Sequence, residues 1–327
     1  MYKRQKDNTG TKRPLIILTG PTAVGKTALS IGLAKAIQGE IISADSMQVY
    51  RGMDIGTAKI TKEQMDGVPH HLIDIMDPSD SFHVMAFQQK CKEAMEDIYA
   101  RHKIPILVGG TGFYIQSVLY DISFTETDTD IEYRQKLQKI AEEQGGYVLH
   151  ARLAKIDPEA ADEIHPNNVK RVIRALEFNH QTGEKISIHN EQERQKKSPY
   201  QFRYYVLSLP REILYDRINR RVDVMRRDGL VDEVKGLLQQ GITPNMVSMQ
   251  GLGYKEIIDA LQGSCSFEEA FERIKRETRH FAKRQFTWFR RERDVTWIDK
   301  ETYENEDAIL QYMIEDLKNA YILPADQ

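Results

Sequence analysis

A phosphate-binding loop is the clearest chemical feature of this sequence. Residues 20–27 read G-P-T-A-V-G-K-T, which matches the P-loop pattern G-x-x-x-x-G-K-T. In such a loop the glycines let the backbone wrap around an anion, the lysine adds a positive charge and the threonine hydroxyl can bind Mg²⁺. The residues predicted to bind a diphosphate or triphosphate are Gly20, Pro21, Thr22, Ala23, Val24, Gly25, Lys26 and Thr27.

A second candidate group is the carboxylate of Asp45, at the end of the predicted buried strand 40–45. Beside a P-loop, such a carboxylate can accept a proton from a substrate or hold Mg²⁺ through water, so Thr27 and Asp45 are the candidate metal ligands. The apolar run 104–108 ends in glycines and not in the aspartate that helps to hold the metal in ordinary ATPases and GTPases. This difference argues against an ordinary cycle of nucleotide hydrolysis.

Basic residues form several further clusters. Arg217 and Arg221 are four residues apart in a predicted helix, so they share one face and could together take up charge on a leaving phosphate. A basic stripe on the predicted helix 271–293 lies opposite an apolar stripe and comprises Arg276, Arg279, Lys283 and Arg290. A smaller cluster comprises Lys170, Arg171 and Arg174. Because the net charge of the chain is only −3, such local clusters suggest a clamp for a polyanion.

The elements that must position these residues follow an α/β pattern. Short apolar runs at 14–19, 40–45, 104–108, 202–209 and 295–298 alternate with helical patterns. The alternation predicts a P-loop NTPase-like core over 14–122 and 201–327, with a parallel sheet and helices on both faces. Ligands bind at the carboxyl ends of such strands. The P-loop, Asp45 and Thr111 all fall at predicted strand ends, so we expect them to share one cleft.

Two segments fall outside this pattern. Residues 123–200 are polar, show helical patterns and contain no convincing strand, which predicts an inserted all-helical domain. Residues 1–13 are polar and basic and are expected to form a flexible tail.

The composition excludes several other classes of protein. A hydrophobic content of 40% and a charged content of 29% are typical of a globular protein in water. The longest apolar stretches are strand-sized, so no segment is expected to span a membrane. Cys91 and Cys265 lie far apart, which excludes a cysteine zinc site and fits a reducing cytosol. His70 and His71 lack the spacing of metal ligands and are expected to be structural.

Short motifs recur in order over nearly the whole chain. They are the P-loop at 20–27, I-S-A-D-S-M-Q-V-Y at 42–50, G-M-D-I-G-T-A-K at 52–59, P-H-H-L at 69–72, G-G-T at 109–111, H-P-N-N at 165–168 with Arg171 and R-A-L-E at 174–177, G-L-G-Y at 251–254, and A-K-R-Q at 282–285 with Thr287 and Trp288. Together they closely resemble the motifs of the tRNA dimethylallyltransferases. The sequence departs from the family pattern at Asn168, where Asp is more usual, and at Ile60, where Pro is common. Asn168 keeps a capping side chain but loses a charge.

The resemblance implies an activity. Members of this family transfer a dimethylallyl group from dimethylallyl diphosphate to the exocyclic N6 amine of the adenine 3′ of the anticodon in tRNA. The P-loop would then hold the diphosphate of an isoprenoid with Mg²⁺, and the 123–200 insertion would bind the anticodon stem-loop. We expect a cytoplasmic enzyme that acts as a monomer.

The resemblance also implies roles for single residues. Asp45 would be the general base, Thr111 would help to hold the diphosphate, and Arg217 and Arg221 would stabilise the leaving group. The residues expected to contact tRNA are Asp45, Ser46, Met47, Gln48, Thr111, Arg134, Lys170, Arg171, Val172, Ile173, Arg174, Lys283 and Arg284.

Three alternatives remain open at this stage. A small-molecule P-loop kinase would share the P-loop and the strand-end carboxylate, but would leave the basic surfaces and the insertion unexplained. An isopentenyltransferase acting on a free adenine nucleotide would have less use for a large insertion. An RNA-binding P-loop switch protein would need a metal-binding aspartate that senses the nucleotide, and the sequence offers none at the expected strand end.

Overall fold

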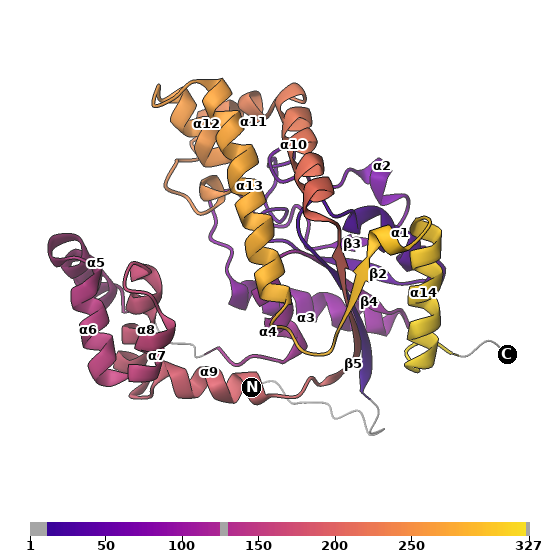
Figure 1. Cartoon of the computed structure of the whole chain (residues 1–327), viewed down its shortest axis with the longest axis horizontal. Coiled ribbons are helices and arrows are strands. Elements are labelled where there is room, and N and C mark those ends of the chain that lie inside the picture. The colour runs from indigo at the N-terminus through magenta and orange to yellow at the C-terminus, as the bar shows by residue number, and fades with distance from the viewer. Residues whose placement is uncertain (1–11, 125–129, 325–327) are drawn as a thin grey trace. The chain divides into compact units, whose positions relative to one another are not determined.

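The computed structural model of the chain describes residues 12–124 and 130–324, and its centre is a six-stranded parallel sheet (Figure 1). The strand order is β3-β2-β4-β1-β5-β6. The strands are β1 (Arg13–Thr19), β2 (Glu40–Ala44), β3 (His70–His71), β4 (Pro105–Gly109), β5 (Tyr200–Ser208) and β6 (Val295–Asp299). The P-loop strand β1 lies between β4 and β5, so it is buried on both edges as well as on both faces.

Helices cover both faces of the sheet, as the alternating pattern predicted. On one face α1 (Lys26–Ile37) and α14 (Glu306–Asn319) pack together, while α3 (Val84–Ala100) and α4 (Gly112–Leu119) pack on the other (Figure 1). Side chains of β1 that include Ile16 and Leu18 join α1 and α14 in one hydrophobic core. A central parallel strand covered on both faces must be apolar throughout, which explains the run 15–18. The predicted fold class is confirmed.

A group of helices follows β5 along the chain. They are α10 (Arg211–Arg227), α11 (Leu230–Gln239), α12 (Tyr254–Leu261) and α13 (Phe267–Phe289), with a short 3-10 turn at Ser248–Gln250. Helix α13 has 23 residues, which makes it about 35 Å long. It begins with a capping box, in which the Ser266 hydroxyl accepts from the Glu269 amide and the Glu269 carboxylate accepts from the Ser266 amide.

A second compact unit comprises the described residues between Tyr120 and Ser198. Its helices are α5 (Ile131–Gln144), α6 (Gly146–Ile156), α7 (Pro158–Glu163), α8 (Val169–Thr182) and α9 (Ile186–Gln195). Leu137, Leu149, Leu153 and Leu176 belong to a hydrophobic core of its own. The unit ends before Tyr200, because Tyr200 already pairs with Arg13 in the sheet.

The same strand pair corrects the predicted tail. Residues 1–11 lie outside the described part of the chain. Arg13 belongs to β1, so the tail predicted for residues 1–13 extends too far into the sequence. The sequence patterns do not predict several elements, among them the two-residue strand β3, the short helices α2 (Lys62–Met65) and α7, and the helix α9. Among the described helices, none combines the length and the apolar character needed to cross a bilayer.

Candidate active site

The P-loop connects β1 to α1 at the carboxyl edge of the sheet. Gly20 and Gly25 have φ angles of 146° and 97°, a backbone region that other residues rarely adopt. A Cβ atom on Gly20 would also lie 2.6 Å from the carbonyl oxygen of Leu207. The Lys26 ammonium donates to the carbonyl oxygens of Gly20 and Pro21, each at 2.9 Å. These contacts hold the lysine across the mouth of the loop.

Asp45 and Thr111 lie on the strands next to the P-loop strand. Ala44 at the end of β2 pairs with Gly109 at the end of β4, and the Thr111 amide donates to the Ala44 carbonyl at 3.3 Å. Because β4 also pairs with β1, the structure brings the ends of these three strands together, as the sequence predicted. Thr111 then precedes α4, and its carbonyl accepts from the amides of Tyr114 and Ile115.

Backbone amides fix one oxygen of the Asp45 carboxylate. Its Oδ1 accepts from the amides of Met47 at 2.8 Å and Gln48 at 3.3 Å. Both amides bind Oδ1, so within the described part of the chain Oδ2 is the oxygen that can accept a substrate proton. Ser46, Met47 and Gln48 continue from the carboxylate, and the Gln48 amide group donates to the carbonyls of Thr57 and Ala58, each at 3.4 Å.

Lys26 has an unusual protonation equilibrium. Burial lowers the pKa of its ammonium, the nearby Arg221 guanidinium lowers it further, and Asp45 partly opposes them; the result is a pKa of about 7. Near neutral pH the site therefore contains both neutral and charged lysine. A phosphate group at this position would favour the charged form, because an adjacent anion raises the pKa of an ammonium.

We expect diphosphate binding to be linked to proton uptake by Lys26. At pH 8 the free ammonium is mostly deprotonated, so binding should take up as much as ~1 proton at this group, and affinity should fall as the pH rises above 7. Calorimetry in buffers of different ionisation enthalpy measures this uptake. Lys26→Arg is the control, because its guanidinium is charged before and after binding and takes up no proton. Proton uptake by the diphosphate itself is the same in both proteins. Equal uptake in both proteins would contradict the prediction.

Both predicted arginines of α10 reach the P-loop. The Arg221 guanidinium donates to the Thr22 hydroxyl at 3.4 Å. Nη1 of Arg217 lies 3.7 Å from the position that a Cβ on Gly25 would take. The spacing of four residues places both side chains on the same helix face, which is the face that contacts the P-loop.

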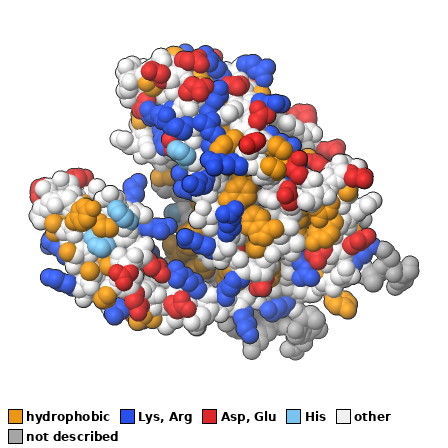
Figure 2. Space-filling view, viewed as in Figure 1, with side chains coloured by type: hydrophobic (Ala, Val, Ile, Leu, Met, Phe, Trp, Pro, Cys, Tyr) orange, Lys and Arg blue, Asp and Glu red, His pale blue; other side chains and the backbone are white. Residues whose placement is uncertain are grey.

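The basic residues of α13 divide into two groups. Lys283 and Arg284 are exposed and line a groove of about 450 Å³ with His280, Thr287, Trp288 and Arg291. Blue Lys and Arg side chains gather over the part of the molecule that contains α10 and α13 (Figure 2). Arg279, predicted as part of the basic stripe, instead contacts α10, because its guanidinium donates to the side-chain oxygen of Asn219 at 2.6 Å.

The helical unit corrects part of the predicted tRNA surface. Lys170, Arg171 and Arg174 are exposed on α8. Val172 and Ile173, predicted with them, are 0% and 4% exposed and belong to the core of the unit, so their side chains cannot contact RNA. The predicted contact residue Arg134 is half exposed, and its guanidinium pairs with both oxygens of the buried Glu177 carboxylate at 2.6 and 2.8 Å.

Gln285 on α13 connects two loops of the site, and the sequence analysis missed this function. Its Oε1 accepts from the Thr22 amide of the P-loop and its Nε2 donates to the Gly110 carbonyl, each at 2.9 Å. Its side chain is buried, and its spacing placed it in the apolar stripe of the helix. The only earlier signal was its polar type at a core position, since buried polar groups need partners.

Glu233 on α11 was also missed. Its carboxylate accepts from the amides of Asp54 at 2.8 Å, Ile55 at 2.7 Å and Gly56 at 3.1 Å, and from the Tyr254 hydroxyl at 2.7 Å. Glu233 therefore fixes the loop at residues 54–56. The carbonyls of Thr57 and Ala58, which follow in the same loop, accept hydrogen bonds from the Gln48 side chain.

Two other polar groups lie away from this site. His71 hydrogen-bonds Glu40 at 2.7 Å, a structural contact. Burial opposes ionisation of Glu40, but hydrogen bonds from Arg101, His71 and Lys103 lower its pKa to about 2.

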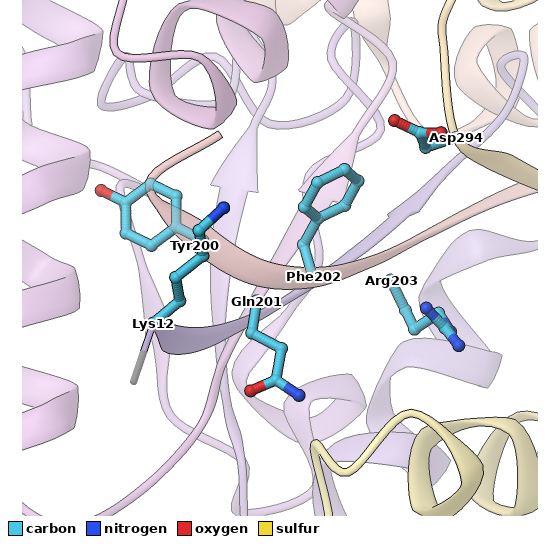
Figure 3. A pocket seen from close by; sticks show the side chains of 6 residues that line it. All are labelled: Lys12, Tyr200, Gln201, Phe202, Arg203 and Asp294. Atoms are coloured by element: carbon cyan, nitrogen blue, oxygen red, sulfur yellow. The ribbon is translucent and has the colours of Figure 1, made fainter. Parts of the chain in front are cut away.

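A groove of about 500 Å³ lies along the first half of β5, at the opposite end of the strands from the P-loop, and is lined by Lys12, Tyr200, Gln201, Phe202, Arg203 and Asp294 (Figure 3).

The fold and the site together define the class of this protein. It is a P-loop α/β protein in which a strand-end carboxylate and two arginines surround an anion-binding loop. The model of one family, described as IPP transferase, matches residues 48–292. The chain belongs to this family of transferases.

Curated relatives cover almost the whole chain. A protein of Lachnoclostridium phytofermentans named tRNA dimethylallyltransferase is 57% identical over 311 residues, which are 95% of this chain and 99% of the relative. A protein of Bacillus pumilus with the same name is 53% identical over 289 residues, which are 88% and 90% of the two chains.

Solved structures show the same fold. The full-length tRNA isopentenylpyrophosphate transferase of Bacillus halodurans is 46% identical, with a TM-score of 0.71 over 95% of this chain and 99% of the other. A eukaryotic dimethylallyltransferase described as acting on tRNA is 32% identical, with a TM-score of 0.78 over 96% of this chain and 81% of the other.

Proposed function

We propose that this protein transfers a dimethylallyl group from dimethylallyl diphosphate to the N6 amine of the adenine 3′ of the anticodon in tRNA. The observation that carries the proposal is the meeting of Asp45, Thr111 and the P-loop at three adjacent strand ends. A diphosphate held by the loop would place its prenyl group next to a fixed carboxylate. The family and the names of its relatives support the same substrates.

The proposed reaction uses these groups in order. The allylic carbon–oxygen bond breaks with carbocation character, and its electrons leave with the diphosphate. The P-loop amides, Lys26 and the arginines Arg217 and Arg221 stabilise this charge. The adenine N6 forms the new bond to the allylic carbon and gives one proton to Asp45. The products are the prenylated base and diphosphate.

We propose Mg²⁺ as the metal of this reaction. Among the described residues there is no group of three or more His, Cys, Asp or Glu side chains that could hold a metal alone. The Thr27 hydroxyl, exposed at the start of α1, nevertheless fits magnesium, which binds few protein ligands and completes its shell with phosphate oxygens and water. When bound, the ion would neutralise charge on the leaving diphosphate. Asp45 could contribute through a water molecule.

The proposed nucleic-acid partner is the anticodon stem-loop of tRNA. Exposed cations on α8 and α13 are suited to phosphate contacts, and the target adenine must leave its stack to reach a strand-end carboxylate. We propose that the enzyme acts in the cytoplasm, where tRNA is available, and as a monomer.

The proposal is tested by following labelled dimethylallyl diphosphate in the presence of tRNA, free adenine nucleotides, or ATP with small hydroxyl compounds. Label in the tRNA adenine 3′ of the anticodon is the expected result. Label in a free nucleotide would support the nucleotide transferase alternative. Tight ATP binding, with phosphate transfer to a small acceptor, would support the kinase alternative and contradict the proposal.

Replacing Arg171 and Arg174 together by Ala should weaken tRNA binding and reduce its salt dependence. Each lost phosphate contact lowers the slope of log affinity against log salt by about one, or by less for single-stranded RNA. Affinity for dimethylallyl diphosphate should stay unchanged. A salt titration of tRNA binding measures the effect, and Lys139→Ala with Lys155→Ala, on α5 and α6 of the same unit, is the charge-matched control. Unchanged tRNA affinity with a raised Michaelis constant for the diphosphate would contradict the assignment.

A further inference from the structure

Lys300 lies at the P-loop although it is far from it in sequence. It directly follows β6, whose carboxyl end is at the same edge of the parallel sheet as the end of β1. Its side chain is only 8% exposed. Its Nζ lies 2.7 Å from the position that a Cβ on Gly25 would take, so the ammonium is in contact with the residue that precedes α1.

Two other charged atoms converge on the same point. Nη1 of Arg217 and Oε1 of Glu306 each lie 3.7 Å from the Cβ position of Gly25. Glu306 accepts a hydrogen bond from the Lys300 ammonium at 2.6 Å. Glu306 is in the first turn of α14, and its side chain is 47% exposed. It can therefore turn towards solvent, while the buried Lys300 cannot.

This arrangement places a carboxylate beside an anion-binding loop. Amides at the start of α1 and nearby cations favour a phosphate at Gly25, and a carboxylate in the same place repels it. A buried ammonium needs an anionic partner, and either Glu306 or a phosphate can serve. Lys300 and Glu306 are more than 270 residues from the P-loop in sequence and are not among the residues predicted to bind the diphosphate, so this pair is an addition to the predicted site.

We propose that Lys300 is a further diphosphate-binding residue, and that Glu306 is its internal counter-ion, which competes with the diphosphate for it. This inference requires only that the loop binds a diphosphate. The statement that this diphosphate carries a prenyl group rests on the proposed function. On this proposal the ammonium binds the diphosphate as it enters, and Glu306 recovers the ammonium as the product leaves. Glu306 thereby limits how tightly the product is held.

The test measures the binding of inorganic diphosphate with Mg²⁺ to the full chain by calorimetry. Lys300→Gln should weaken binding by about 10- to 100-fold, the effect of losing one hydrogen bond to a charged group. Lys300→Arg should restore most of the affinity. Glu306→Gln should tighten binding by about 2- to 5-fold, because a half-exposed negative charge next to the ligand is removed. The charge-matched control is Lys35→Gln at the other end of α1, which should bind like the wild type.

Two results would overturn the proposal. Wild-type affinity in Lys300→Gln would remove Lys300 from the site, and weaker binding in Glu306→Gln would mean that Glu306 only positions the lysine. Melting temperatures show whether each variant folds, and Glu306→Gln tests the competition even if Lys300→Gln is unstable. A wild type that binds diphosphate but transfers no prenyl group would contradict the proposed function and leave this inference intact.

Discussion

Asp45→Ala is expected to fold normally and to lose ~10²- to 10⁴-fold in turnover, the usual contribution of a positioned general base. The carboxylate follows β2 beside the P-loop, and its Oδ1 is fixed by the Met47 and Gln48 amides. Removing it leaves the adenine amine without a group to accept its proton. Single-turnover rates with saturating tRNA and dimethylallyl diphosphate measure the loss.

Asp45→Asn separates the base from its structural contacts. The amide oxygen of asparagine can still accept from the two backbone amides, so the loop should keep its shape. We expect this variant to be nearly as slow as Asp45→Ala while binding tRNA with wild-type affinity. Near-normal turnover in either variant would show that another group removes the proton.

Lys26→Ala is expected to weaken diphosphate binding and to reduce turnover by ~10²- to 10³-fold, as for other single groups that stabilise transition-state charge. The ammonium lies across the loop on the carbonyls of Gly20 and Pro21. These carbonyl contacts are the ones that a phosphate oxygen would replace. Initial rates over a range of dimethylallyl diphosphate concentrations separate the effect on binding from the effect on turnover.

Lys35→Ala is the matched control, because it removes the same charge from the last turn of the same helix. Its kinetics should equal those of the wild type. Dimethylallyl diphosphate should also raise the melting temperature of the wild type more than ATP does, and should have little effect on Lys26→Ala. Equal stabilisation of both proteins by the diphosphate would contradict the role of this lysine.

The sequence predicted the parts of the site that depend on local pattern. The P-loop is a contiguous motif, and Asp45 and Thr111 follow apolar strands, so their meeting follows from the parallel sheet. The spacing of Arg217 and Arg221 fixed a common helix face, and both side chains reach the loop. In each of these cases a few neighbouring residues determine the position.

Other parts depend on contacts that no local pattern contains. Gln285 is separated by 263 residues from its partner Thr22, and its helical spacing is that of a core residue. Lys300 is placed by the register of β6 on β5, which the sequence does not reveal. Val172 and Ile173 belong to the stretch 170–174 that the family resemblance implied as a tRNA contact, but helical geometry turns these two side chains into the core.

The position of β1 in the sheet has a consequence for synthesis on the ribosome. β1 pairs with β4 on one side, but its other side needs β5, which ends only at Ser208. At about 5–20 residues per second, roughly 10 to 40 s pass between the emergence of the two strands. During that time the nascent chain carries an apolar strand with an open edge, a template for wrong pairing. The unit between Tyr120 and Ser198 has a core of its own and can fold in this interval, whereas the open edge of β1 is covered only after β5 has emerged.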